Sequence, residues 1–250
     1  MTRRHGLAPD PKTDMGLFDT QVQEIRSFLE EKRRAGEVSE FRAETRTEWP
    51  LESSLVLEED SGLELGKPDI GSIFFILWAG ESEVEDGLIS LVGPDAGEAV
   101  ERSIPFAQVV MVRGSFTDEY DCYRELRDAV YDIGLKGFMV RTLPSRQSIW
   151  CRVGREALEE GFSLGDVGTA LVKTLKDVDF VSGVEVLFVT SCREDLDRLG
   201  PTAAGARRLV EAMMKMYEEE NFDCSTCEYQ DVCETVGELK MMKEKLASEG

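Results

Sequence analysis

The apolar residues near the beginning of the chain follow a helical spacing. They recur every three or four positions, at Phe18, Val22, Ile25 and Leu29. This pattern predicts an amphipathic helix that needs a partner for its one apolar face. Asp19 can cap the first turn, and Gly36 predicts the end of the helix because glycine readily adopts the left-handed conformation. Residues 37–72 mix acidic residues with glycine and proline, which predicts irregular connections and one short strand over 54–57.

Two apolar runs follow, and each predicts a strand. Residues 73–78 are continuously apolar, which is typical of a strand that is buried on both faces. Residues 88–92 predict a second, shorter strand. It stops at Gly93-Pro94-Asp95, a sequence with the conformational preferences of a turn.

The most regular pattern spans residues 105–200. It predicts strands over 106–112, 138–143, 148–153 and 184–190, a helix over 118–133, and a second helix that Ser163 caps. The order strand–helix–strand–strand–helix–strand is that of a ferredoxin-like sandwich. We therefore predict an α+β fold, an α/β sandwich, whose βαββαβ core carries extra N-terminal strands and a helix. A cysteine-bearing helical hairpin is expected at the C-terminal end.

These elements divide the chain into four predicted regions. Residues 1–16 show no periodicity and predict a disordered leader. Residues 17–104 are expected to supply a helix and short strands that pack on the core. The α/β sandwich core then spans 105–200, and the helical hairpin with its metal site spans 201–250.

The charge of the chain narrows the range of partners. It has 50 acidic and 29 basic residues, for a formal net charge of −21. The negative electrostatic field of such a chain repels phosphate backbones and anionic lipid, so we expect neither nucleic acid nor a membrane surface as a partner. No apolar run approaches the roughly 18 residues that a bilayer-spanning helix needs. The cysteines are clustered rather than dispersed as in a disulfide framework, which predicts a cytoplasmic protein.

The scarcity of histidine excludes several kinds of catalytic site. The one histidine, His5, stands in the predicted leader. A serine–histidine–aspartate triad, a histidine general base and a histidine-rich metal site are therefore excluded. The glycine-rich phosphate-binding motifs of nucleotide-binding proteins are also absent from the sequence.

Three of the six cysteines fall within ten residues of one another. Cys224, Cys227 and Cys233 have the spacing C-x2-C-x5-C, which lets thiolates converge on one metal ion or cluster. An iron–sulfur cluster, zinc and an unliganded trio all remain open. The acidic neighbours of these cysteines disfavour free thiolates and so favour a bound metal. A fourth ligand could come from Cys192, from a carboxylate or from a partner chain, or the position could stay open.

A group of arginines surrounds the predicted strand pair, at Arg141, Arg146, Arg152 and Arg155. In a chain this acidic, such a group predicts a local surface for coenzyme A or another anion. The alternative is that the arginines pair with neighbouring acids, and the sequence by itself favours this second interpretation.

Several short motifs occur in the order found in a known family. They are Leu63-Glu64-Leu65-Gly66-Lys67-Pro68, Gly93-Pro94-Asp95, Trp150-Cys151-Arg152-Val153, Glu156-Ala157 with Gly161-Phe162, Gly168 and the strand 184–190, and the C-x2-C follows. In this order the chain resembles the middle part of the CO-methylating acetyl-CoA synthase, the beta subunit of the acetyl-CoA decarbonylase/synthase complex. The resemblance spans roughly residues 60–233.

The resemblance implies the beginning of that family's A-cluster, a [4Fe-4S] cubane bridged to a nickel pair. Cys224 and Cys227 match its first two cubane ligands, and Cys233 matches the third at a shortened spacing. Arg146 and Arg152 lie in the region that the family uses near coenzyme A. The fourth cubane cysteine and the Cys-Gly-Cys nickel motif have no counterpart in the seventeen residues after Cys233.

We therefore expect an iron–sulfur protein of CO dehydrogenase and acetyl-CoA metabolism that acts in electron transfer, assembly or scaffolding. Its expected partners are components of the CO dehydrogenase/acetyl-CoA synthase machinery or a redox protein. Two alternatives remain. One is a catalytic acetyl-CoA synthase fragment that a separate chain completes, and the other is a non-enzymatic interaction module with structural zinc.

Overall fold

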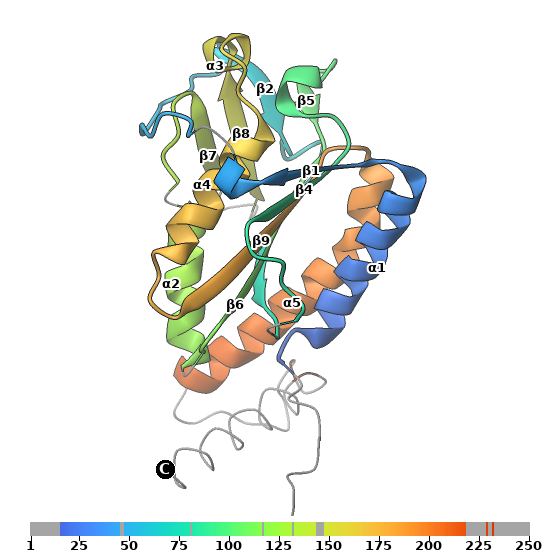
Figure 1. The fold of residues 1–250 in the computed structure, drawn as a ribbon, viewed down its shortest axis with the longest axis vertical. Coiled ribbons are helices and arrows are strands. Elements are labelled where there is room, and N and C mark those ends of the chain that lie inside the picture. The colour runs from blue at the N-terminus through green and yellow to red at the C-terminus, as the bar shows by residue number, and fades with distance from the viewer. Residues whose placement is uncertain are drawn as a thin grey trace, which may run out of the picture.

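The computed structural model describes residues 16–45, 48–80, 82–116, 118–131, 133–143 and 148–218, together with Tyr229 and Val232. Within these residues, two mixed β-sheets are combined with helices that lie mainly against the larger sheet (Figure 1). The predicted α+β sandwich class is therefore confirmed. The predicted leader, except for Gly16, and the predicted last helix lie outside the described residues.

The larger sheet has five strands in the order β1-β4-β9-β6-β3. They are β1 (Val38–Arg42), β4 (Leu88–Val92), β9 (Val181–Val189), β6 (Phe106–Gly114) and β3 (Ser72–Trp78). The β4–β9 and β3–β6 pairs are parallel, whereas β1–β4 and β6–β9 are antiparallel. The middle strands are buried along nearly their whole length, which explains why most of their residues are apolar.

Helices cover both faces of this sheet (Figure 1). On one side lie α1 (Asp19–Ala35) and the long α5 (Arg193–Glu218), which pack on each other and on β1 and β3. On the other side lie α2 (Glu119–Tyr131) and α4 (Leu164–Lys176), with α4 against β9 and β4. The apolar face of each helix is thereby removed from water, which is the main source of stability for such layers.

The smaller sheet has four strands in the order β5-β2-β8-β7 and lies at one end of the molecule (Figure 1). They are β5 (Ser103–Ile104), β2 (Ser61–Leu65), β8 (Ser148–Gly154) and β7 (Phe138–Leu143). The short helix α3 (Arg155–Glu159) follows β8, and two 3-10 turns, η1 (Ala43–Thr45) and η2 (Ala96–Glu98), complete the elements.

The helix ends follow from the side chains at their termini. Ser163 caps α4 by accepting from the Gly165 N–H at 3.0 Å, while Asp166 accepts from the Ser163 N–H at 2.9 Å. Gly36 ends α1 with φ at 73°, as predicted. Asp19 differs from the prediction, because Phe18 is the residue at the cap position and the Asp19 carboxylate accepts from the Gly16 N–H instead.

The ferredoxin-like pairing was wrong, although the predicted order of elements is found. The strands β6 and β9 belong to the larger sheet, and β7 and β8 belong to the smaller one. A ferredoxin-like sheet would place β8 beside β6. The parallel strand β3 occupies that edge of β6 from Ser72 to Trp78, so β8 pairs with β2 instead.

The N-terminal strands also differ from the prediction. Residues 54–57 form no strand, and β1 and β2 were not predicted. Both are weakly patterned, because β1 is a mostly exposed edge strand and β2 contains Gly62. The run over 73–78 is a strand, yet it forms the sheet edge, and its residues up to Phe75 are only half buried.

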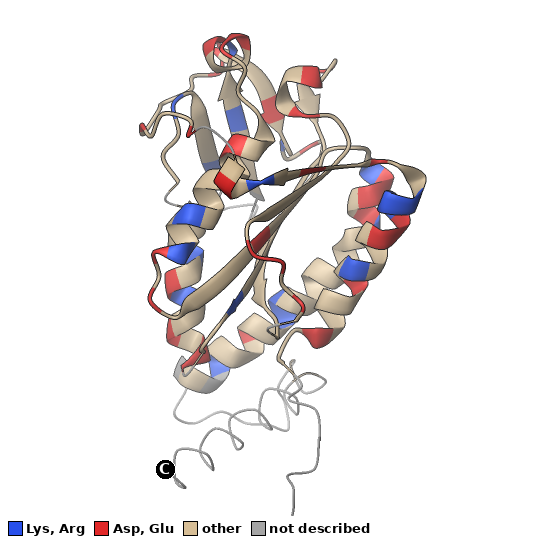
Figure 2. Ribbon diagram, viewed as in Figure 1, with Lys and Arg blue, Asp and Glu red and all other residues tan. Residues whose placement is uncertain are grey.

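Charged residues are concentrated on the helices and connections, with few on the strands of the larger sheet (Figure 2). Glu185 on β9 is an exception, since it is fully buried. Its two carboxylate oxygens contact the Arg26 guanidinium of α1 at 2.5 and 2.6 Å. In the described part of the chain, no helix has both the length and the apolar character to cross a membrane.

The acidic connection before β4 is held to β9 by two carboxylates, one from each segment. Glu185 accepts from the Glu85 N–H at 2.8 Å, and Asp86 accepts from the Val184 N–H at 3.1 Å. Asp86 also contacts the Lys176 ammonium of α4 at 2.6 Å. Burial raises the pKa of Asp86, but the hydrogen bonds from Lys176 and Val184 outweigh it, so the pKa lies below its ordinary value.

The parallel strands β4 and β9 end side by side, and Gly93, which follows β4, lies very close to Ser191, which follows β9. Its φ is 106°, and a Cβ there would lie 2.5 Å from the backbone nitrogen of Ser191. Thr190 holds the two segments together on either side of Gly93. Its N–H donates to the Val92 carbonyl at 2.9 Å, and its hydroxyl donates to the Pro94 carbonyl at 2.7 Å.

Replacing Asp86 with Asn should cost stability in a pH-dependent way. A carboxylate with a depressed pKa stabilises the fold above its unfolded-state pKa, near 4, and loses this effect as the pH falls through the folded-state pKa. We expect Asp86→Asn to lower the free energy of unfolding by about 1–2 kcal/mol at pH 7 and by much less near pH 3. Urea denaturation at both pH values measures this. The exposed Asp179→Asn is the charge-matched control, and an equal loss at both pH values would contradict the account.

Replacing Gly93 with Ala should destabilise the protein strongly. The new Cβ combines a left-handed backbone with a clash against Ser191, and such strain costs about 2 kcal/mol or more. Gly97→Ala is the matched control, because nothing lies within 4 Å of the position that its Cβ would take and its φ is not in the left-handed range. Denaturant midpoints should fall for the first variant and stay near wild type for the second.

Candidate functional site

The smaller sheet has one apolar face and one polar face. Pairing across β2 and β8 places Glu64 directly opposite Arg152, and across β8 and β7 it places Trp150 opposite Arg141. Directly paired residues share a face, so these four side chains lie on the same side of the sheet. The other face carries Leu63, Leu65, Cys151 and Val153, all of which are buried in the core.

Arg152 is committed to an internal ion pair. Its Nε lies 2.6 Å from Glu64 Oε1, and the two side chains are only 8% and 9% exposed. Its other nitrogens reach the Val56 carbonyl at 3.4 Å and the Glu58 carboxylate at 3.6 Å. This arrangement agrees with the salt-bridge interpretation of Arg152 rather than with an open anion site.

The remaining arginines of the predicted group have different surroundings. Arg155 donates to the Glu59 carbonyl, and Arg141 lies over the Trp150 ring with its Cζ 5.4 Å from the ring centroid. Arg146 lies outside the described residues. The structure therefore brings Arg141 and Arg152 to one face, but the guanidinium of Arg152 is already occupied.

Two buried polar atoms on this face stand out. Among the described residues, neither Glu64 Oε2 nor Trp150 Nε1 has a hydrogen-bond partner. Sequence reasoning missed Glu64 as the partner of Arg152. The signal was present in β2, where Glu64 stands between two leucines that alternate toward the core.

The cysteines of the predicted metal site, Cys224, Cys227 and Cys233, lie outside the described residues. Within the described part of the chain, no group of three or more potential metal-ligating side chains is found. Cys151 is fully buried, which raises the pKa of its thiol, and Cys122 is buried as well. Both have the inert character of structural cysteines.

Cys192, the candidate fourth ligand, is half buried at the turn between β9 and α5. It hydrogen-bonds to Asp195, which also contacts the Lys32 ammonium at 2.8 Å and accepts from the Ser191 hydroxyl at 2.5 Å. Burial raises the pKa of Asp195, but these partners outweigh it and the pKa lies below its ordinary value. Sequence reasoning did not foresee this network around the thiol.

Cys192 lies far from the described residues of the C-terminal segment. It precedes the first turn of α5, whereas the Tyr229 ring lies 5.8 Å from Lys215 Nζ, close to the last turn. At about 1.5 Å per residue, roughly 30 Å of helix separates Arg193 from Lys215. Cys192 and Tyr229 therefore lie near opposite ends of α5, and Cys224, Cys227 and Cys233 lie outside the described residues.

Comparison with known proteins identifies a family that this chain matches. The family model described as the CO dehydrogenase/acetyl-CoA synthase complex beta subunit matches residues 52–194, more than half of the 250-residue chain. The chain belongs to this family. The match begins just before β2 and ends in the first turn of α5, so it includes every strand of both sheets except β1. The resemblance inferred from the sequence is thereby confirmed.

The curated relatives of this beta-subunit family member are longer proteins. The acetyl-CoA decarbonylase/synthase complex subunit beta of Archaeoglobus fulgidus is 25% identical over 213 residues, which cover 82% of this chain and 40% of the relative. The corresponding subunit of Methanothermobacter thermautotrophicus is 35% identical over 113 residues, which cover 44% and 24%. The beta 2 subunit of Methanosarcina thermophila is 24% identical over 194 residues, which cover 73% and 41%. The chain thus spans about two fifths of these relatives at most.

The Glu64–Arg152 pair yields a stability prediction. Arg152→Leu leaves a buried carboxylate without its cation, and breaking a buried pair in this way costs about 3 kcal/mol or more. The double variant Glu64→Leu with Arg152→Leu should recover much of that loss, because no uncompensated charge remains. Urea denaturation of the wild type, of the two single variants Glu64→Leu and Arg152→Leu, and of the double variant measures the coupling.

Arg141→Leu serves as the control on the same face. It removes a half-buried cation over Trp150, so a loss of no more than about 1 kcal/mol is expected. A double variant as unstable as the Arg152 single variant would contradict the internal-pair account.

Proposed function

We propose that this protein functions in CO dehydrogenase and acetyl-CoA metabolism as a beta-subunit-related iron–sulfur protein. The observation that carries the proposal is the family match over residues 52–194, which spans both sheets of the fold. Relatives of the matched family carry the name of the acetyl-CoA decarbonylase/synthase complex. The proposed role is beside components of that complex, and the proposed location is the cytoplasm.

The proposed metal ligands are Cys224, Cys227 and Cys233. Their spacing suits a [4Fe-4S] cluster, in which three thiolates hold three irons and a further ligand holds the fourth. The described α+β part offers no competing group of ligands, so the cluster, if bound there, would be a feature of the C-terminal segment. The proposed fourth ligand is Cys192, with a carboxylate, a partner chain or an open position as the alternatives.

The proposed role is electron transfer, assembly or scaffolding. A cluster among acidic residues favours the oxidised state and docking to a basic protein surface, because the whole chain carries a net charge of −21. Coenzyme A is a further proposed ligand, for which Arg146 is the remaining cation because Arg152 is paired with Glu64. The alternative proposal is that the protein is a fragment of a catalytic acetyl-CoA synthase, and that a separate chain completes the enzyme.

Anaerobic purification tests the cluster directly. We expect about four irons and four sulfides per chain after reconstitution, as a [4Fe-4S] cluster requires, and an EPR signal on reduction. Cys227→Ser should remove most of the iron and the signal. The variant Cys122→Ala, which removes a buried cysteine of α2, should keep both.

A colourless protein after careful reconstitution would refute the cluster. One zinc per chain, together with unfolding by a chelator and no EPR signal, would instead establish the structural-zinc alternative. In that case Cys227→Ser should lower thermal stability without changing any redox property.

A further inference from the structure

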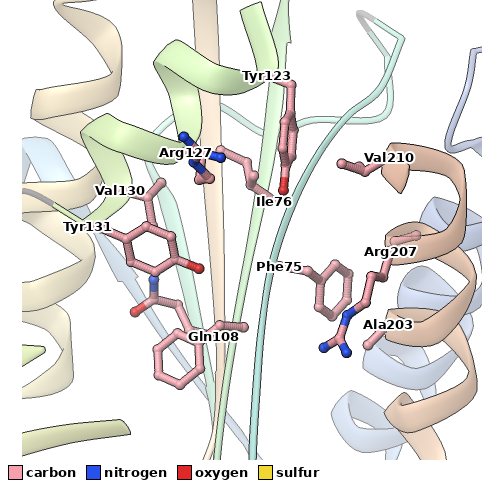
Figure 3. A pocket seen from close by; sticks show the side chains of 12 residues that line it. Phe75, Ile76, Gln108, Tyr123, Arg127, Val130, Tyr131, Ala203, Arg207 and Val210 are labelled. Atoms are coloured by element: carbon pink, nitrogen blue, oxygen red, sulfur yellow. The ribbon is translucent and has the colours of Figure 1, made fainter. Parts of the chain in front are cut away.

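A small cavity lies where the edge strand β3 passes between α2 and α5. Its volume is about 80 Å³, and its lining comes from β3, β6, α2 and α5 (Figure 3). Phe75, Ile76 and Val130 form part of its apolar wall. The α5 residues that line it lie beyond residue 194, where the family match ends. The cavity is therefore not a feature that the matched segment builds by itself.

The charge of the cavity is the reverse of the charge of the protein. The chain has 50 acidic and 29 basic residues, yet none of the described residues that line this cavity is acidic. Two of the lining residues, Arg127 and Arg207, are basic. The Arg127 guanidinium is held by Asp128 at 2.8 Å. Among the described residues, Arg207 forms no ion pair or hydrogen bond, so its charge is available to a ligand.

A buried polar side chain also faces this space. Gln108 on β6 is only 6% exposed and is one of the residues that line the cavity. Figure 3 shows the hydroxyl groups of Tyr123 and Tyr131 directed into the same space between α2 and α5. Buried amides need hydrogen-bond partners, and a ligand bound in this space could provide one.

The lining groups share the ability to donate hydrogen bonds. Burial and the neighbouring Tyr123 raise the pKa of Tyr131 to about 12, and burial raises the pKa of Tyr123 as well. Both phenols therefore stay protonated at neutral pH and can donate. An arginine, an amide and two phenols around an apolar wall suit a ligand with one anionic oxygen pair and a compact apolar part.

We propose that this cavity binds a small organic monocarboxylate. Arg207 pairs with the carboxylate, Gln108 and the tyrosine hydroxyls donate to its oxygens, and the alkyl part lies against Phe75 and Val210. The volume limits the size of the ligand, since a cavity of roughly 150 Å³ accepts benzene. A chain of a few carbons, such as butyrate, fits this limit. Binding here requires none of the cysteines, so failure of the cluster test leaves this proposal intact.

Calorimetric titration of the full chain with butyrate tests the proposal, with butyramide as the uncharged probe of similar shape. Butyrate should bind saturably at one site per chain, and butyramide should bind at least tenfold more weakly. Arg207→Gln should weaken butyrate binding about tenfold to hundredfold, because a charge-assisted contact is lost. Arg208→Gln, the neighbouring arginine of α5 that does not line the cavity, should bind within twofold of wild type.

A second variant and a second probe locate the site. Gln108→Leu should weaken butyrate binding, and in the wild-type protein the side-chain amide signal of Gln108 should shift during an NMR titration. Equal binding of butyrate and butyramide, or unchanged binding by Arg207→Gln, would overturn the proposal. So would the absence of saturable butyrate binding, or tighter binding of inorganic phosphate than of butyrate at the same site.

Discussion

The antiparallel pairing of β6 with β9 is the contact on which the other layers depend. It runs from Ala107 opposite Val189 to Gly114 opposite Val181 and places two buried strands at the centre of the larger sheet. Phe106 and Phe188 stack across it with ring centroids 5.8 Å apart. Each of these strands then accepts a parallel neighbour, β3 beside β6 and β4 beside β9, and helices cover both faces. Since β6 has no free edge left, the hairpin of β7 and β8 must find its partner elsewhere, and β2 supplies it.

The pairing of β8 with β2 determines which side chains meet on the smaller sheet. Pairing of β8 with β2 places Arg152 opposite Glu64, and the buried ion pair removes Arg152 from any open anion-binding surface. A buried pair of this kind contributes little net stability, yet either partner alone would be a costly buried charge. The pair therefore specifies the register of β2 on β8 more than it strengthens the fold. Glu64 could be paired with Arg152 only once the strand order was known.

The long helix α5 separates Cys192 from Tyr229. Cys192 and its Asp195–Lys32 network lie at the first turn, and the Tyr229 ring lies beside Lys215 near the last. Between them, Arg207 faces the cavity at the β3 edge. Residues from four elements line that cavity, and its hydrogen-bond donors come from three of them, so no local pattern in the chain predicts it. None of the described residues that line it is acidic, although the chain carries a net charge of −21.

The sequence by itself determined the α+β class, the helices near residues 19, 119 and 164, most strands of the larger sheet, the β7–β8 hairpin and the family. Hydrophobic spacing and caps act within a few residues, so these local choices follow directly from the sequence, as at Ser163 and Gly36. Only the tertiary structure decided that β3 is the neighbour of β6, that Arg152 pairs with Glu64, and that Gln108, Tyr131 and Arg207 meet around one cavity. Strand partners and cavities depend on which apolar faces, distant in the sequence, pack together. An amphipathic pattern shows that a face must be buried, but it does not show which element buries it.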